Sequence, residues 1–315
     1  MMKKCIKSIL IFILIISFIN CNSFNLRSEN SNQNIPHLAW ISHKLVYENE
    51  LIKDFEHLNF RKIESEDDQF RCNIISILNK NEVDIIVVFR GTELDLLKNI
   101  WADLNVTPIK LSGLCQGCQV HMGFYNAYET IKEKVILNLD EEIHQQSNAG
   151  HTKVNLYFTG HSLGGGIAAI GTYDFLNRRA AKDLKDLYFK TIRNVSLITF
   201  GCPRVGVGEF KEFFNQKDLL RDNLRIVYGD DVVPDLVAGH PLSYYRHNGD
   251  FAHFPENNFD EPEVFGREET DKWIRPGGII DKFNFNKKIQ DHRKYFLLNP
   301  KGVEYAIKKL RDERK

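Results

Sequence analysis

A run of apolar residues near the middle of the chain leads directly into a glycine-rich turn that holds a serine. Residues 154–159 are predicted to form a short buried strand, and the small residues after the turn predict the start of a helix. Ser162 lies between Gly160 and Gly164, and these glycines allow a strand and a helix to approach closely. The pattern predicts a nucleophile elbow, in which a strained backbone lifts the serine hydroxyl above the sheet edge. A structural glycine-rich turn is the alternative.

Further segments rich in β-branched residues alternate with helical stretches along the chain. This alternation predicts an α/β fold with a mostly parallel central sheet that is covered by helices on both faces. Reactive groups then belong at the carboxyl ends of the strands. Residues 252–286 are polar, contain three prolines and lack clear periodicity, so we expect an irregular excursion there. The expected strands are 72–78, 83–89, 154–159, 195–200 and 224–228, and the expected helices are 37–49, 123–146 and 162–179.

The N-terminus has the features of a secretory signal peptide. Three lysines precede an apolar run at residues 9–19, which is too short to span a bilayer comfortably. Small residues just before Phe24 suit cleavage there, and a lipid-anchored Cys21 and an uncleaved anchor are the alternatives. We expect a secreted protein with a signal peptide at 1–23, a polar linker at 24–36 and a single domain at 37–315.

The cysteines and the charge balance fit this interpretation. Cys115 and Cys118 could close a small disulfide loop in an oxidising compartment, whereas a zinc site would need a second ligand pair at a suitable spacing. Cys72 and Cys202 lie in or beside expected strands and are interpreted as small buried apolar residues, with a pairing between them left open. Basic and acidic residues balance at 42 each, so nothing argues for a nucleic-acid partner.

Two glycosylation sequons also fit a secretory protein. They begin at Asn105 and at Asn194. Asn194 adjoins an expected strand, so Asn105 is the better candidate for a glycan.

A serine nucleophile needs a base and an acid that orients the base, and in α/β-hydrolases these follow the serine as acid and then histidine. The expected strand at 224–228 is followed by Asp230 and Asp231, and one of them is a candidate for the acid unless both are solvated turn residues. Four histidines come later in the chain. His240 follows too closely, and His247 and His253 bracket a turn and are expected at the surface, which favours the last one, His292.

Two hydrogen-bond donors are needed to stabilise the oxyanion of the tetrahedral intermediate. One candidate is Leu163, the residue after the serine. The second is Thr92, which follows Gly91 at the end of the expected strand 83–89. A plain strand-ending turn is the alternative for this second segment.

Taken together, these segments resemble the fungal-type class 3 lipases. The similar segments occur in the family's order: 89–92, 99–104, 115–124, the turn at Ser162, 199–206, 231–234 and 291–296. The resemblance implies an α/β-hydrolase fold in which Ser162 is the nucleophile, Asp231 the acid and His292 the base. It also implies Thr92 as an oxyanion donor, a local disulfide between Cys115 and Cys118 and a structural role for His161.

In that family, the segment after the oxyanion strand forms a lid over the active site. Here the segment is a residue or two longer than usual, and Ile100 separates Asn99 from Trp101. An apolar inner face of such a lid would favour adsorption to a lipid surface, although the same residues could pack in the core. The apolar lid candidates are Leu94, Leu96, Leu97, Ile100 and Trp101.

The sequence therefore predicts a secreted serine carboxylic-ester hydrolase of acyl lipids, first of all a triacylglycerol lipase. Phospholipase, galactolipase or feruloyl-esterase activity is the alternative within the same chemistry. A non-catalytic lipase-like binding protein is the alternative from another class. We expect no cofactor, no metal and no obligate protein partner, and the expected contact is a lipid–water interface.

Overall fold

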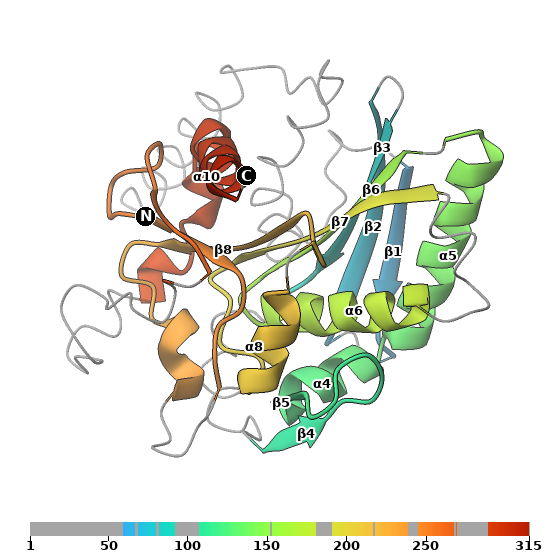
Figure 1. Cartoon of the computed structure of the whole chain (residues 1–315), viewed down its shortest axis with the longest axis horizontal. Coiled ribbons are helices and arrows are strands. Elements are labelled where there is room, and N and C mark those ends of the chain that lie inside the picture. Colours follow the sequence, from blue (N-terminus) through green and yellow to red (C-terminus); the bar gives the residue numbers. More distant parts are fainter. Residues whose placement is uncertain are drawn as a thin grey trace, which may run out of the picture.

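The computed structural model describes residues 59–66, 69–79, 82–91, 107–151, 153–180, 191–216, 218–238, 245–267, 269 and 289–314. Several features expected from the sequence lie outside these residues, namely the signal peptide, the linker, the helix at 37–49, Thr92, the lid candidates and the sequon at Asn105. Within the described ranges, eight strands form one sheet in the order β1-β2-β3-β6-β7-β8-β9-β10 (Figure 1).

The middle of the sheet is parallel and its two ends are antiparallel. β3, β6, β7, β8 and β9 run parallel to one another, whereas β1 and β2 pair antiparallel with their neighbours and β10 pairs antiparallel with β9. This arrangement confirms the predicted α/β-hydrolase class with a mostly parallel sheet. The strands are β1 (Asn59–Glu64), β2 (Arg71–Asn79), β3 (Glu82–Phe89), β6 (Val154–His161), β7 (Ile192–Phe200), β8 (Asp222–Tyr228), β9 (Asp250–Phe254) and β10 (Glu263–Phe265).

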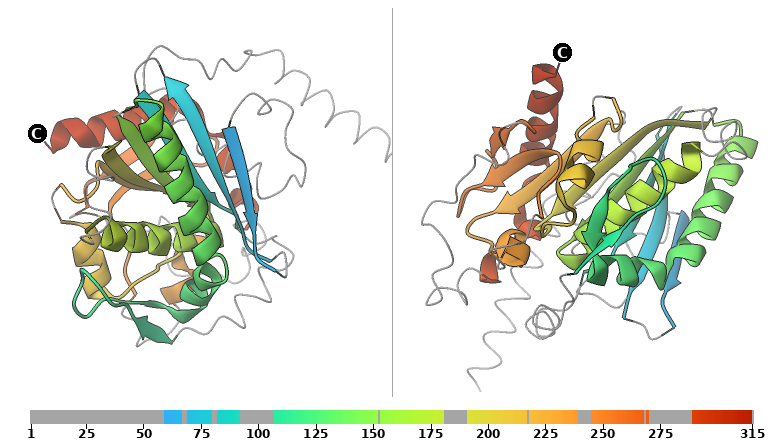
Figure 2. Two further views of the ribbon diagram at one scale, coloured as in Figure 1. Left: turned by 90° about the vertical axis from the view of Figure 1, so that its right-hand side faces the viewer. Right: turned by 60° about the horizontal axis from the view of Figure 1, so that its bottom comes forward.

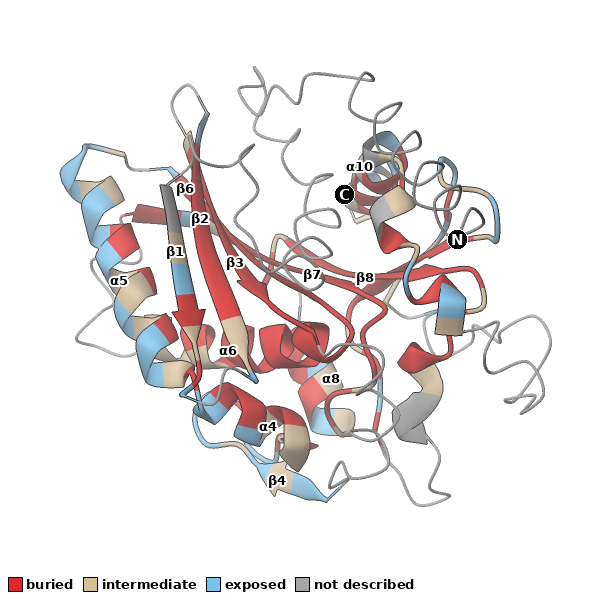
Figure 3. Ribbon diagram, turned by 180° about the vertical axis from the view of Figure 1, so that it is seen from behind, coloured by how far each residue is buried: buried red, intermediate tan, exposed pale blue. Residues whose placement is uncertain are grey.

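The central strands are buried on both faces, as Figure 3 shows, and every residue of β6 is buried. Alternate side chains enter two different hydrophobic clusters. In β6, Leu156 and Phe158 join one cluster, whereas Tyr157 joins the other. A parallel strand between two helix layers needs apolar residues on both sides, which explains why the sequence shows continuous apolar runs there.

The helices in the described ranges cover the two faces of the sheet unequally (Figure 2). Residues of α4 (Met122–Glu129), α5 (Lys132–Asn148), α6 (Leu163–Ala180) and α8 (Gly208–Phe214) belong to the first cluster. α10 (Pro300–Glu313) packs in the second cluster through Val303, Ala306, Ile307 and Leu310. None of the helices in the described part of the chain has the length and apolarity needed to cross a bilayer.

One helix expected at 123–146 is instead two helices. α4 ends at Glu129, and α5 begins at Lys132. Thr130 caps the end of α4, and its hydroxyl donates to the carbonyl oxygen of Ala127 at 2.8 Å. The apolar pattern continues across the break, because buried side chains such as Tyr128 and Val135 lie on either side of it. Periodicity alone therefore does not reveal where the helix is interrupted.

The expectation of an irregular excursion at residues 252–286 is wrong in its first part. β9 extends the parallel sheet beside β8, and β10 pairs with it. All five residues of β9 are buried, so the strand lacks the polar–apolar alternation that marks a half-exposed strand. Most of the later part of this stretch lies outside the described residues.

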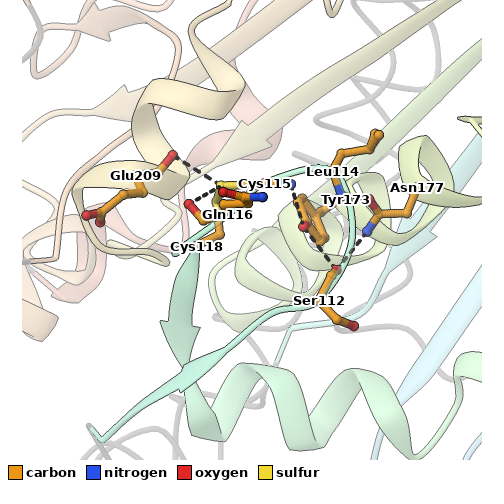
Figure 4. Close-up of a disulfide and its surroundings, with 8 residues drawn as sticks. All are labelled: Ser112, Leu114, Cys115, Gln116, Cys118, Tyr173, Asn177 and Glu209. Atoms are coloured by element: carbon orange, nitrogen blue, oxygen red, sulfur yellow. Dashed lines mark hydrogen bonds between the residues drawn. A yellow bond between two sulfur atoms is a disulfide. The ribbon is translucent and has the colours of Figure 1, made fainter.

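A small second sheet carries the disulfide. β4 (Pro108–Lys110) pairs with β5 (Gln119–His121), and the loop between them contains the Cys115–Cys118 bond expected from the sequence (Figure 4). The hydroxyl of Tyr173 in α6 accepts from the Cys115 N–H at 3.2 Å and donates to a carbonyl of the same loop at 3.1 Å. The disulfide loop is thereby fixed to α6.

The two other cysteines in the described part, Cys72 and Cys202, are free thiols. Both are buried, and burial raises the pKa of both thiols. The interpretation as small buried residues is confirmed, and the open question of a bond between them is answered in the negative.

His121 forms the N-terminal cap of α4. Its Nδ1 accepts from the Gly123 N–H at 3.1 Å, and its ring stacks on Phe124 with the ring centres 4.4 Å apart. The side chain is fully buried, and this burial lowers the pKa of His121 to about 4. The cap therefore requires the neutral form of the imidazole.

Candidate active site

Ser162 occupies a sharp turn between β6 and α6. Its φ angle is +60°, a left-handed conformation that is uncommon for residues other than glycine. The turn is tight, because a Cβ atom on Gly160 would stand 2.3 Å from the Gly164 carbonyl carbon, and one on Gly164 would stand 2.2 Å from the Phe89 oxygen. The Ser162 N–H donates to the carbonyl of Phe200 at 2.9 Å, which ties the turn to the end of β7. This geometry is that of a nucleophile elbow.

Asp231 and His292 form a buried pair. Nδ1 of His292 lies 2.8 Å from Oδ2 of Asp231, and neither side chain is exposed to solvent. The other carboxylate oxygen, Oδ1, accepts from the Val233 N–H at 2.9 Å, at the start of the 3-10 helix η3 (Val233–Ala238). A carboxylate accepts hydrogen bonds, so Nδ1 of His292 carries the proton and Nε2 of the neutral ring has a free lone pair. This is the tautomer that a general base requires.

Gly201, directly after β7, provides the space for this pair. Its φ angle is +55°, and a Cβ atom there would stand 2.8 Å from Oδ2 of Asp231 and 2.9 Å from Nδ1 of His292. The carboxylate and the imidazole therefore lie against the backbone at the end of the strand next to β6. The ends of β6, β7 and β8 converge here, as expected for a site at the carboxyl edge of a parallel sheet.

Two atoms at this site have no hydrogen-bond partner among the described residues. They are Oγ of Ser162 and Nε2 of His292, and both are buried. Buried polar atoms without partners are costly, and native proteins usually satisfy them. Catalytic hydrogen bonds are often incomplete before substrate binds, so an unpartnered serine oxygen and an unpartnered imidazole nitrogen are what a nucleophile and its base would present.

The backbone around Ser162 offers a place for negative charge. Leu163 is the first residue of α6, so its N–H has no intrahelical partner and points from the positive end of the helix. Gly91, after β3, lies against the elbow, because a Cβ atom there would stand 3.3 Å from Cβ of Ser162. The next residue in the chain is Thr92, the second donor expected from the sequence.

The structure corrects the placement of two other histidines. His247 and His253 were expected at the surface, but both are buried. His253 lies within β9, which pairs with β8 in the sheet, and His247 lies three residues before this strand. Burial lowers the pKa of His247 well below its ordinary value, with the charge of Arg225 as a second cause. Nε2 of His253 bonds the Gly229 carbonyl oxygen at 2.9 Å.

The sequence assigned no role to Tyr295, although it is part of the segment at 291–296. Its hydroxyl, at the start of the 3-10 helix η5 (Tyr295–Leu297), donates to Oδ2 of Asp231 at 2.6 Å and accepts from the Tyr228 N–H at 3.1 Å. Oδ2 of Asp231 thus receives two hydrogen bonds, one from His292 and one from Tyr295. The spacing of three residues between His292 and Tyr295 was the available indication, because it places both on one short turn.

The sequence profile described as lipase (class 3) matches residues 86–240. The phospholipase A(1) DAD1 of Arabidopsis thaliana, named as chloroplastic, is 32% identical over 158 residues, which are 48% of this chain and 33% of that protein. A lipase of Rhizomucor miehei is 28% identical over 196 residues, which are 62% of this chain and 48% of that protein. The matches therefore span a third to a half of the length of these relatives.

Solved structures share the fold over more of the chain. The Rhizomucor miehei lipase in complex with its propeptide has a TM-score of 0.61 and 22% identity, and the match covers 86% of this chain and 83% of that one. Lipase II of Rhizopus niveus has a TM-score of 0.58 with 22% identity over 86% of this chain and 96% of that one. At this level of identity the likeness establishes the fold.

Proposed function

Because the chain belongs to the class 3 lipase family, we propose that it is a serine carboxylic-ester hydrolase that cleaves acyl esters of lipids. The observation that carries the proposal is the buried Asp231–His292 pair, whose free Nε2 accompanies an unpartnered Ser162 Oγ on a strained turn. A buried glycine-rich turn with only a structural role has no need for two costly unpartnered atoms.

The geometry supports the following reaction. Nε2 of His292 takes the proton of Ser162 Oγ as the oxygen attacks the ester carbonyl carbon. The negative charge on the carbonyl oxygen is stabilised by the Leu163 N–H and, as the sequence indicates, by Thr92. The imidazolium of His292 then gives its proton to the departing alcohol, which leaves an acyl-serine. Water, deprotonated by His292, attacks this ester. His292 then returns the proton to Ser162 Oγ as the fatty acid leaves, while Asp231 orients the ring throughout.

A Ser162→Ala variant tests this reaction directly. We expect hydrolysis of a soluble p-nitrophenyl ester to fall by about a thousandfold or more, because the nucleophile is removed. A fluorophosphonate probe should label the wild-type protein and leave the variant unlabelled. Wild-type hydrolysis by Ser162→Ala would exclude the proposal, and absence of labelling in an otherwise folded wild-type protein would favour a non-catalytic binding protein.

Triacylglycerols are the first substrates we propose. Relatives named as lipase and as secreted mono- and diacylglycerol lipase A support a neutral acylglycerol, whereas the plant relative is named as a phospholipase. Emulsified triacylglycerols, phospholipids and soluble short-chain esters should be compared above and below the solubility limit of each substrate. A rate jump on emulsions would support adsorption to a lipid–water interface, and a preference for phospholipids would replace the acylglycerol assignment.

We also propose that the protein is secreted. The lysine-flanked apolar segment at the N-terminus and relatives named as secreted support this. Expression of the full chain in a eukaryotic host should yield a product in the medium that lacks about the first 23 residues. Retention of the intact N-terminus in the cell pellet would contradict secretion.

A further inference from the structure

His161 is the residue directly before Ser162 and the last residue of β6. It pairs with Phe200 in the sheet, and its side chain is only 1% exposed. The family resemblance assigned it a structural role. Its contacts, however, go to His292, which lies 131 residues further along the chain.

Nε2 of His161 lies 2.8 Å from the backbone carbonyl oxygen of His292. A carbonyl oxygen only accepts hydrogen bonds, so Nε2 of His161 carries a hydrogen and donates it. The bond is buried, and a bond of this kind is therefore shielded from competition with water. It fixes the carbonyl group of His292 to the last residue of β6, directly before Ser162.

The rings of the two histidines also touch. Their centres lie 4.2 Å apart with an angle of 33° between the planes, and the His161 ring centre lies 5.2 Å from that of Tyr295. His161 thus fills the space between the elbow and the turn that holds His292. The His292 ring therefore packs directly against the residue that precedes the nucleophile.

His292 is consequently held at two points, its Nδ1 by Asp231 and its carbonyl by His161. The first bond sets the orientation of the ring, whereas the second sets the distance of its backbone from the nucleophile's strand. We propose that His161 is a positioning residue that fixes the location of His292, and hence of its Nε2, relative to Ser162. This inference rests on the proposed function, in which Nε2 of His292 takes the proton of Ser162.

Three substitutions at His161 distinguish the effect of its hydrogen bond from the effect of its ring. In His161→Gln, the amide nitrogen is as many bonds from Cα as Nε2 of histidine, so it reaches the same carbonyl. In His161→Asn, the nitrogen stops at the position of Nδ1 and does not reach it. His161→Phe keeps a ring of similar shape and removes the donor.

We expect His161→Gln to retain kcat within about threefold of wild type, and His161→Asn and His161→Phe to lose about tenfold to a hundredfold, because displacement of a catalytic group by about 1 Å costs on that order. KM for the soluble ester should change little in all three variants, since substrate contacts remain. The rate of fluorophosphonate labelling should fall in parallel with kcat. Retention of kcat by Gln together with its loss in Phe is a result that a purely space-filling role would not produce.

Wild-type kcat in a folded His161→Phe variant would overturn the proposal, as would equal losses in Gln and Asn. If the variants do not fold, nitrogen-15 NMR of the wild-type protein decides the question. A protected Nε2–H of His161 with a coupling across the bond to the His292 carbonyl is expected, and its absence would contradict the inference. Ser162→Ala serves as the control, because its full activity would refute the proposed function itself.

Discussion

Buried polar groups differ in their hydrogen bonding between the two ends of the central parallel strands. At the amino ends, Asn155 of β6 donates to Asp84 of β3 at 2.9 Å, and Asn194 of β7 donates to Asn155 at 2.7 Å. At the carboxyl ends of the same strands, Ser162 Oγ and His292 Nε2 are buried without partners among the described residues. The polar groups at the amino end satisfy one another and so stabilise the fold, whereas those at the carboxyl end are left available for a ligand.

The largest expected effect tests the carboxyl end. Asp231→Asn should lower kcat for a soluble ester by about a thousandfold or more, because an amide in this place favours the wrong tautomer of His292. The neighbouring Asp230→Asn is the matched control and should stay within about twofold of wild type. Steady-state kinetics with folded variants, checked by circular dichroism, decide the outcome. Similar losses of kcat in both variants would contradict the assignment of Asp231, and not Asp230, as the residue that orients His292.

A smaller loss is expected when only the second donor to Asp231 is removed. Tyr295→Phe should reduce kcat by about tenfold to a hundredfold, since a hydrogen bond to a charged group contributes roughly 1.5–3 kcal/mol. The control is Tyr228→Phe, which removes a buried hydroxyl that accepts from the Asn257 N–H at 3.0 Å. Kinetics of the two variants should differ although their melting temperatures fall similarly. Equal kcat values for the two variants would show that the Tyr295 hydroxyl contributes only to stability.

At the amino end, the expected effect is on stability and not on rate. Asn155→Leu removes the link between Asp84 and Asn194 and should lower the free energy of unfolding by about 1–3 kcal/mol, the cost of an unsatisfied buried polar group. Urea unfolding measures this loss, and kcat of the folded variant should be unchanged. A large fall in kcat without destabilisation would mean that the two ends of β6 are coupled.

The smallest expected effect is that of Asn194→Gln, which should leave the glycosylation of the protein unchanged. The Asn194 side chain is committed to Asn155 within the folded sheet, so we expect a glycan at Asn105 and none at Asn194 in protein from a eukaryotic secretory host. Mass spectrometry with and without enzymatic deglycosylation measures this. Asn105→Gln should remove the mass shift, whereas Asn194→Gln should leave it in place. A glycan on Asn194 would show that the amino end is open to modification before β7 forms.

The sequence predicted the carboxyl end of the sheet better than the rest of the fold. The elbow at Ser162 and the order of the acid and the histidine are encoded in short local patterns, in which turn chemistry determines the backbone. β9 was missed because burial on both faces removes the alternation that identifies a strand, and with it the burial of His247 and His253 was missed.

Two contacts around the Asp231–His292 pair were not predicted, namely the bond from His161 to the His292 carbonyl and the bond from Tyr295 to Asp231. Each joins segments far apart in the chain, and such contacts depend on how the chain folds back upon itself. The sequence gives the side chains that are present, but the contacts between distant segments are determined by the tertiary structure.

The histidine cap of α4 makes the protein sensitive to acid. His121 holds the helix start only while its Nδ1 is unprotonated, and burial lowers its pKa from 6.5 to about 4. The unfolded chain takes up this proton near pH 6.5 and the folded chain only near pH 4. The contribution of His121 to the free energy of unfolding is therefore complete above pH 6.5 and is lost as the pH falls toward 4. Purification and storage near neutrality should preserve the fold, whereas elution from a column in dilute acid should lower its melting temperature.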